Sequence, residues 1–359
     1  MKKYCSSKGF TIIELMVSIF ITMTIIASFY KLYDVSVKTE RSSSIRVAVN
    51  LMGEQILDTV SESLRLIGLN SVKEDFTGVN NEGKSLIIHE AGEQKLEYLS
   101  PFGSPITKVK GCSGGDEGAD CGTYPTCTFL LFNSAAFYSG VDKLYFHNQD
   151  GFFKTSSVSL NDYSENGVKV TATFASSDND GTSCRDFFPV GSLVTGEDFV
   201  FTLEYGSSSE ANALQLSYVK ESNSSVGGTL INFSYDPNNE NNYYSMPKFV
   251  LEYLVETCDG AGTCVTNWIT PKGGAVLSDS QVKSIIAVRF GFVLLSRKER
   301  VYRGEETPSG LPKYCIFSDT NTTDDYYCYT LPSLNYTASV FRRVVYLSNY
   351  RFLKDQAGN

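Results

Sequence analysis

Histidine is scarce in this sequence, and positive charge is in the minority. The 359 residues include one tryptophan, ten prolines and two histidines, His89 and His147. Two histidines leave little material for a histidine-based metal site or catalytic centre. The 31 basic residues are outnumbered by 40 acidic ones, which gives a formal net charge of −9. That balance argues against bulk electrostatic binding to nucleic acid, because phosphate neutralisation needs a surplus of Lys and Arg.

We also expect no functional motif of the common enzyme classes. The chain has no G-x-G-x-x-G after an expected strand and no H-E-x-x-H, and we expect neither a serine-hydrolase nucleophile elbow nor a nucleotide-binding loop. Asp178-Asn179-Asp180-Gly181 resembles a calcium loop but fails the EF-hand order, because Ser183 stands where glycine is needed. We therefore expect a protein that is not an enzyme and that holds no metal or other cofactor.

The N-terminus is the most informative segment. A short basic stretch ends at Gly9, and residues 10–30 form an apolar run interrupted by Glu14. This run has about the ~20 residues that a helix needs to span a bilayer, and no A-x-A cleavage site follows it. The positive-inside rule leaves the basic end in the cytoplasm and exports the body of the chain. The sequence therefore predicts a retained single-pass anchor.

Glu14 departs from the apolar pattern, because an ionised carboxylate in lipid costs several kcal/mol unless it is paired. Two interpretations stay open. The side chain either reaches the membrane interface from a position near the helix end, or it pairs with a cation when several such helices pack together.

Lys8-Gly9-Phe10-Thr11-Ile12-Ile13-Glu14-Leu15, followed by an apolar helix, resembles the class III signal of type IV pilins and type II secretion pseudopilins. The resemblance implies that a prepilin peptidase cuts between Gly9 and Phe10 and that Phe10 is then N-methylated. It also implies that Glu14, the fifth mature residue, pairs with the N-terminal amine of a neighbouring subunit during filament assembly. Loss of Lys2, Lys3 and Lys8 with the leader would take the formal charge from −9 to −12.

The helix is expected to continue past the membrane as an amphipathic stem. Its apolar residues recur at spacings of three or four, which is the pattern of one helical face. No proline occurs before Pro101, and Gly68 offers a stop signal. We therefore expect a stem from about Phe10 to Leu66 that packs one face on a globular body. The residues of that face are Ile45, Val49, Met52, Ile56, Val60, Leu64 and Ile67.

Beyond residue 70 the apolar runs are short, rich in β-branched and aromatic residues, and separated by Gly, Asn, Asp and Ser, as is typical of strands. In 284–295, alternation predicts that Ile286, Val288, Phe290, Phe292 and Leu294 share one face, with Arg289 on the other. The fold class expected is α+β: a long N-terminal transmembrane and amphipathic helix packed on a large, disulfide-braced, antiparallel β-rich head. Strands are expected at 85–89, 168–174, 199–205, 214–219, 249–255, 265–269, 284–295 and 339–350.

The cysteines favour disulfides over a zinc site. Nine are present, and loss of Cys5 with the leader leaves an even number, as in a disulfide framework of an oxidising compartment. Their spacings are wider than most zinc knuckles. Cys258–Cys264 and Cys315–Cys328 are expected as local pairs, and the other four residues allow three pairings. The eight disulfide candidates are Cys112, Cys121, Cys127, Cys184, Cys258, Cys264, Cys315 and Cys328.

The order of stem helix, hairpins and a closing Phe-Arg-Arg-Val-Val strand resembles the PilW-like minor pilin family and, more distantly, the J-type minor pseudopilins of type II secretion. One departure is Leu347-Ser348-Asn349, where family members often have a Leu-Arg-Asn-like triplet. The resemblance implies a leader at 1–9, a transmembrane helix at 10–30, an amphipathic stem at 31–68 and a head at 69–359.

By resemblance, the chain is expected to prime assembly of a type IV pilus-like filament and to lie at its tip. Two alternatives stay open: a J-type pseudopilin of a type II secretion system, and a tip adhesin or DNA-uptake pilin. The partners implied are other minor pilins, the major pilin, the prepilin peptidase, the inner-membrane assembly platform and membrane lipid, without nucleic acid. The expected location is the inner membrane, as a single-pass protein with its head in the periplasm, and then the pilus at the cell surface.

Overall fold

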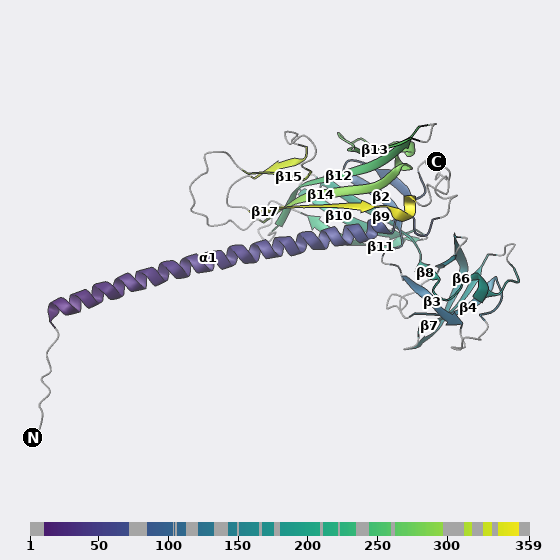
Figure 1. Ribbon diagram of the computed structural model, residues 1–359, viewed down its shortest axis with the longest axis horizontal. Coiled ribbons are helices and arrows are strands. Elements are labelled where there is room, and N and C mark those ends of the chain that lie inside the picture. The colour runs from purple at the N-terminus through teal and green to yellow at the C-terminus, as the bar shows by residue number, and fades with distance from the viewer. Residues whose placement is uncertain are drawn as a thin grey trace, which may run out of the picture.

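A single long helix, α1 (Ile12–Arg65), begins the described chain. Its 54 residues correspond to a length of roughly 80 Å at 1.5 Å per residue, and Figure 1 shows it reaching far beyond the rest of the molecule. Leu66 is the C-cap, and Gly68 follows with a φ of 75°. The computed structural model describes residues 11–71, 85–102, 104, 106–112, 121–132, 143–148, 151–164, 167–175, 180–208, 211–221, 223–234, 244–259, 263–296, 312–317, 326–331 and 337–351.

The two halves of α1 differ in their surroundings. Between Ile12 and Ser44 nearly every described side chain is exposed to solvent. Further along, the face expected from the sequence meets the head. Ile45 and Met52 pack against the core, and the buried residues are Val49, Ile56, Leu57, Val60, Leu64 and Ile67.

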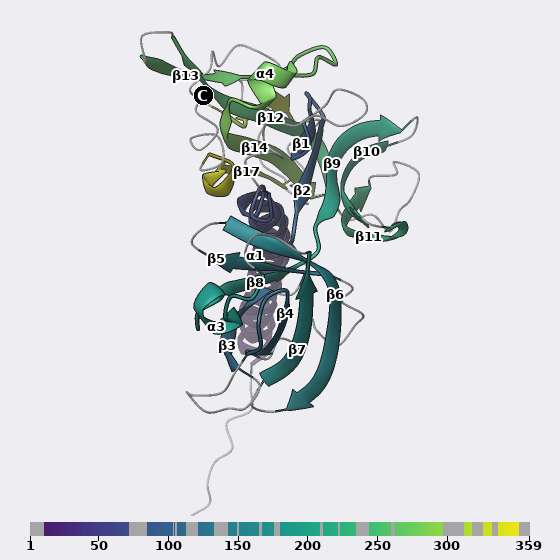
Figure 2. The same cartoon turned by 90° about the vertical axis from the view of Figure 1, so that its right-hand side faces the viewer.

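Two open antiparallel sheets enclose this core together with α1 (Figure 2). The five-stranded sheet has the order β1-β2-β9-β10-β11 and the four-stranded sheet the order β13-β12-β14-β17. The strands of the first are β1 (Ile88–Ala91), β2 (Lys95–Ser100), β9 (Phe199–Ser208), β10 (Ala211–Lys220) and β11 (Asn223–Ser234). Those of the second are β12 (Tyr244–Cys258), β13 (Cys264–Ile269), β14 (Ile285–Ser296) and β17 (Thr337–Tyr346).

A separate closed barrel is inserted between β2 and β9. Its six strands pair in the order β3-β4-β7-β6-β5-β8, and Figure 1 shows it beyond the end of α1 that is far from the N-terminus. The strands are β3 (Ile106–Cys112), β4 (Thr126–Leu131), β5 (Leu144–Asn148), β6 (Gly151–Ser164), β7 (Gly167–Phe174) and β8 (Leu193–Gly196), with the short helix α3 (Cys184–Phe187) between β7 and β8. The barrel has its own core, in which aromatic rings such as those of Phe129, Phe146 and Phe188 pack together.

A small hairpin, β15 (Lys313–Cys315) with β16 (Cys328–Thr330), covers part of the outer face of the four-stranded sheet. Gly291 makes this close approach possible, because a Cβ there would overlap the side chain of Ile316. The helix α4 (Asp279–Val282) precedes β14. The four disulfides are Cys112–Cys121, Cys127–Cys184, Cys258–Cys264 and Cys315–Cys328.

The α+β fold expected from the sequence is confirmed, with a long apolar helix and an antiparallel, disulfide-braced head. The strands expected in the head are present, with ends that differ by a few residues. In β14, four of the five residues expected on the core face, Val288, Phe290, Phe292 and Leu294, join the main core. The fifth, Ile286, does not, because a register shift between β12 and β14 brings Ile285 to that core instead. The closed barrel was not expected from the sequence.

Candidate functional site

The N-terminal end of α1 holds the described part of the predicted processing and assembly site. Thr11 is the N-cap of the helix: its Oγ1 accepts a hydrogen bond from the Glu14 amide at 3.3 Å. In return Oε2 of Glu14 accepts from the Thr11 amide at 2.9 Å and from the Thr11 hydroxyl at 3.0 Å. Gly9 and Phe10 lie outside the described residues. Glu14 is thus part of a capping box that fixes where the helix begins.

The role of Thr11 went unnoticed in the sequence, although Thr-x-x-Glu before an apolar run is the usual signal of a capping box. Both hydrogen bonds to the Glu14 side chain go to the same oxygen. Within the part of the chain that the structure describes, Oε1 has no partner, so the carboxylate can accept a bond from outside the chain while it still caps its own helix.

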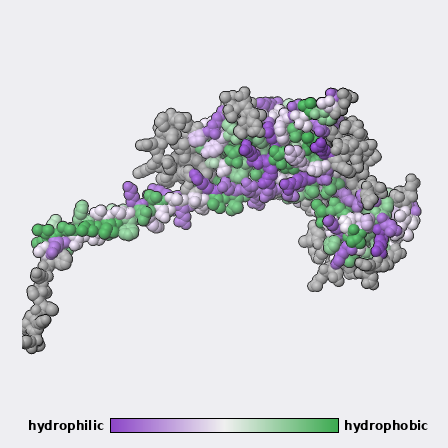
Figure 3. Space-filling view, viewed as in Figure 1, coloured by the Kyte–Doolittle hydropathy of each residue, from purple (hydrophilic) through white to green (hydrophobic). Residues whose placement is uncertain are grey.

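The exposed half of α1 is suited to an apolar environment (Figure 3). Four of its hydroxyl groups are satisfied within the helix: Ser18, Thr22, Thr24 and Ser28 each donate to the carbonyl oxygen four residues earlier, at 2.7–2.9 Å. Unsatisfied polar groups in lipid each cost several kcal/mol. By length and composition α1 can cross a membrane, and no part of its most apolar stretch is buried in the chain.

The other half of α1 is held by the head through close packing and polar contacts. A Cβ at Gly53 would overlap the ring of Phe341, so glycine lets β17 lie directly on the helix. Arg343 of β17 forms ion pairs with Glu54 and Asp58 of α1.

A second strand, β2, is tied to the helix by buried hydroxyl groups. The hydroxyls of Ser63 and Tyr98 are 2.6 Å apart, and Ser100 Oγ donates to the carbonyl oxygen of Ser63 at 2.9 Å. Burial raises the pKa of Tyr98 far above its usual range, so the phenol stays protonated and able to donate. These contacts fix the head on the stem.

A polar cluster lies where the chain enters and leaves the barrel, next to the end of α1. Asn70 is buried; its Nδ2 donates to the Gly196 carbonyl at 2.9 Å and to Asp198 Oδ1 at 3.1 Å, and its Oδ1 accepts from the Thr195 hydroxyl. The side chains of Glu197 and Lys220 are 3.1 Å apart beside it. The stem end is therefore connected to the barrel by hydrogen bonds as well as by the chain.

The outer face of the four-stranded sheet carries a buried ion pair and a pocket. Arg289 Nε donates to Glu252, which also accepts from the Tyr327 hydroxyl at 2.9 Å. The Arg289 guanidinium lies 4.4 Å from the centroids of both the Trp268 and the Phe317 rings. Such cation–π stacking stabilises a buried cation.

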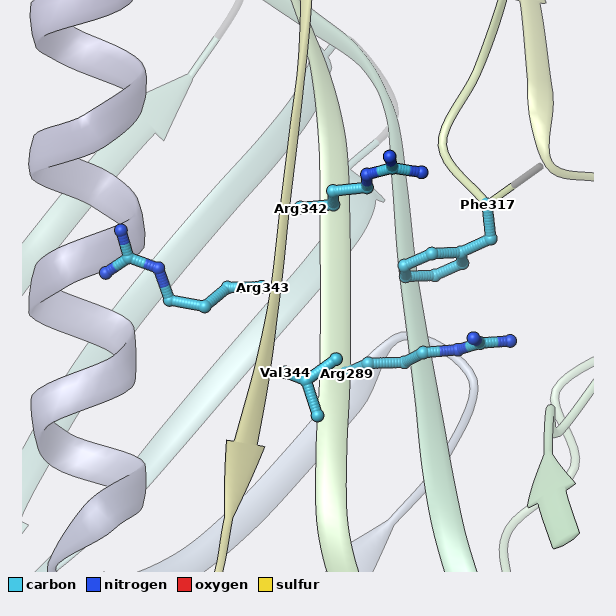
Figure 4. Close-up of a pocket in the computed structure, with 5 residues that line it drawn as sticks. All are labelled: Arg289, Phe317, Arg342, Arg343 and Val344. Atoms are coloured by element: carbon cyan, nitrogen blue, oxygen red, sulfur yellow. The ribbon is translucent and has the colours of Figure 1, made fainter. Parts of the chain in front are cut away.

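The pocket has a volume of about 350 Å³ and is lined by Arg289, Phe317, Arg342, Arg343 and Val344 (Figure 4). Figure 4 shows Arg342 reaching across the sheet toward Phe317, while Arg343 points to α1 on the other side. The two neighbouring arginines of β17 thus serve opposite faces of the sheet.

The two histidines take part in local contacts. Burial lowers the pKa of His147 to about 4, so it is neutral at pH 7. His89 lies 3.2 Å from Glu97, and hydrogen bonding to His89 is the largest factor that lowers the pKa of Glu97 to about 2. Among the described residues, no three His, Cys, Asp or Glu side chains are grouped so that they could hold a metal ion. Asp178 and Asn179 of the calcium-like loop lie outside the described residues.

Contrary to expectation, the letters of G-x-S-x-G do occur, at residues 111–115, where β3 ends. The letters of a nucleotide-binding P-loop, G-x-x-x-x-G-K-S, also occur, at residues 78–85. A P-loop joins a strand to a following helix, whereas this stretch follows α1 and leads into β1. Ser85, the one residue of the motif that the structure describes, is buried, and its hydroxyl accepts from the amides of Ile87 and Ile88. The order of elements is reversed, so this pattern is not a basis for a nucleotide site.

Residues 5–30 match the prokaryotic N-terminal methylation motif. None of the curated proteins matches the chain. Among solved structures, the chain is similar to the type IV-like pilin TTHA1219 from Thermus thermophilus, with 12% sequence identity and a TM-score of 0.22 over 59% of this chain and 87% of that chain. The motif, which joins the basic N-terminus to the apolar helix, is therefore the feature that relates this chain most directly to known proteins.

Proposed function

We propose that this type IV pilin-like protein is a minor pilin that primes filament assembly and lies at or near the filament tip. The observation that carries the proposal is the methylation motif at the start of a helix whose first half is apolar and exposed. Proteins with this N-terminus are anchored in a membrane by the helix and assemble with other pilins. They are structural subunits, and we propose no catalytic activity for this chain.

The proposed division of the chain is a leader at 1–9, a transmembrane helix at 10–30, a stem at 31–68 and a head at 69–359. Prepilin peptidase would cut between Gly9 and Phe10 and methylate Phe10. The head would be exported to the periplasm, where its four disulfides are stable. The helix then leaves the inner membrane at the assembly platform and packs with helices of other minor pilins and of the major pilin.

In this mechanism Glu14 pairs with the α-ammonium group of the neighbouring subunit. Each of the two charges lowers the cost of holding the other in an apolar surrounding. The capping box supports the assignment, because it places the carboxylate at the first turn of the helix and uses only Oε2 within the chain. The eight cysteines have a structural role, as braces of the head.

A tip location is supported by the size and shape of the head. The region after the stem spans nearly 300 residues, and the barrel extends it beyond the end of α1 (Figure 1). Such a head is difficult to repeat along a thin helical filament, whereas one copy at the tip meets no copy of itself above it. Priming follows, because the subunit at the tip is the first to be assembled.

Deletion of the gene and quantification of the protein in sheared filaments test this function. A priming tip subunit is expected in far fewer copies than the major pilin, and its loss should abolish surface filaments. An amount equal to that of the major pilin would contradict the tip location. Normal filaments in the deletion strain together with defective protein secretion would instead favour a pseudopilin of type II secretion.

A further inference from the structure

The free edges of the two open sheets differ in how well they are protected. Native proteins prevent unwanted strand pairing with very short edge strands, bulges and interrupting residues. The edge strand β1 has four residues and a register shift, and β13 has six residues. β11 has two register shifts against β10 and contains Gly227-Gly228. β1 and β11 therefore resist a further strand, whereas β13, which pairs with β12 in continuous register, offers a shorter edge than β17.

The fourth edge, β17, has none of these features. Its sequence, Thr-Ala-Ser-Val-Phe-Arg-Arg-Val-Val-Tyr, contains no glycine, proline or lysine, and it pairs with β14 in continuous register over all ten residues from Thr337 to Tyr346. Among the described strands, β14 is its only partner. A long, regular, β-branched edge of this kind is suited to accept another strand.

The two faces of β17 show which part of the edge is accessible. The inner face lies on α1 and the core, through Phe341 and Arg343. On the outer face, Ala338 and Val340 pack under the β15–β16 hairpin. Farther along, Arg342 is exposed, and Val344 and Tyr346 are 45% and 63% exposed.

The exposed part of this face carries a positive charge that favours an acidic residue on an added strand. Arg289 is neutralised by Glu252, whereas Arg342 forms no ion pair with any described residue. Figure 4 shows Arg342 lying over the outer face, where it lines the pocket. Opposite charges on directly paired strands stabilise the pair and like charges destabilise it. A strand added here would therefore be favoured by an acidic residue opposite Arg342 and by apolar residues opposite Val344 and Tyr346.

We propose that the edge of β17 binds an extended, acidic segment of a partner chain as a fifth, antiparallel strand of the sheet. Every pair in this sheet is antiparallel, so the same direction is assigned to the added strand. Main-chain hydrogen bonds would supply the attachment, and the alternation of apolar and acidic side chains would supply the selectivity. The edge of β17 belongs to the head, so binding there does not require that the N-terminal helix act in a filament.

The test uses the full chain in detergent micelles and the synthetic peptide Thr-Val-Thr-Val-Thr-Glu-Thr, with capped ends. In the antiparallel direction its two valines meet Tyr346 and Val344, and its glutamate meets Arg342. The matched control has lysine in place of glutamate. Amide hydrogen exchange is measured for residues 337–346 and, as an internal control, for β11. The glutamate peptide is expected to slow exchange in 337–346 but not in β11, and to bind about fivefold more tightly than the lysine peptide.

The variant R342E is expected to reverse this preference, and R342Q, which keeps a similar size without charge, should abolish it. The proposal is overturned if neither peptide slows exchange in 337–346, or if both bind the native chain equally well. It is also overturned if all amides of 337–346 already exchange slowly in the free chain, because other parts of the same chain would then cover the edge.

Discussion

The two halves of α1 belong to one uninterrupted helix, but they are stabilised in opposite ways. The half that follows Ser44 buries Val49, Val60 and Leu64 completely against the sheets. The half before it leaves large apolar side chains in the open, among them Phe20 at 72% and Phe29 at 66% exposure. The packed half finds its partners inside the chain. The apolar half requires an environment that the chain does not supply, first lipid and then other helices in the proposed filament.

The comparison shows that anchoring and folding depend on different halves of the same helix. Changes in the first half are expected to affect assembly without unfolding the head. Changes in the second half are expected to destabilise the head without affecting membrane anchoring.

The largest effect is expected for E14Q. Glutamine can keep the capping box but removes the charge, and breaking a buried ion pair costs about 3–5 kcal/mol. The amount of processed protein in sheared filaments should fall about a hundredfold or more, with unchanged unfolding of the head. T11A is the matched control, because it removes the capping hydroxyl and keeps the charge. Equal loss of assembly in both variants would show that helix capping, and not the charge, is what matters.

In the packed half, F341A is expected to lower the free energy of unfolding by about 3–5 kcal/mol, as for other buried phenylalanines. The ring is 6% exposed, stacks on Phe292 at 5.2 Å and lies against Gly53 of α1. Urea unfolding of the full chain in micelles, followed by the fluorescence of the single tryptophan, Trp268, measures the change. Membrane anchoring of the variant should be unaffected. A loss below about 1 kcal/mol would mean that β17 does not hold the stem.

A smaller effect, about 1 kcal/mol, is expected for Y98F, which removes the hydrogen bond to Ser63 of α1. The pH dependence has a definite sign. Because burial raises the pKa of Tyr98 above its unfolded value near 10, the phenol contributes stability that is complete below about pH 10 and is lost as the pH rises further. The variant should therefore lose less stability than the native chain between pH 9 and pH 11. Parallel curves for the two proteins would contradict this assignment.

The smallest effect is expected for R343Q. Its ion pairs with Glu54 and Asp58 involve carboxylates that are 58% and 66% exposed, and exposed pairs contribute about 0–1 kcal/mol. Any loss of stability should shrink further at high salt. A loss above 2 kcal/mol that persists in high salt would mean that these pairs act as a buried network between helix and head.

Local patterns made much of the molecule predictable. The spacing of the apolar residues from Ile45 to Ile67 identified the packed face of the stem, because a helix face is set by near neighbours in sequence. Alternation in β14 placed Arg289 opposite the core face for the same reason. The sequence pattern at Gly9, Phe10 and Glu14 is likewise local, and it is the part that the methylation motif covers.

What the sequence did not reveal depends on contacts between distant residues. Closure of the barrel requires β3 to pair with β8, as in Lys108 with Leu193, and nothing near either residue signals that partner. The surroundings of Arg289 come from separate strands and a loop, which bring Glu252, Trp268 and Phe317 together. The pairing of Cys127 with Cys184 spans 57 residues, so spacing alone left it open.

The most direct test of the pilin assignment is the intact mass of the protein purified from membranes and from sheared surface filaments. The proposed function predicts, in both fractions, a chain that begins at N-methylated Phe10 and has all eight remaining cysteines oxidised. A chain that still begins at Met1 in the membrane, and is missing from the filaments, would contradict it.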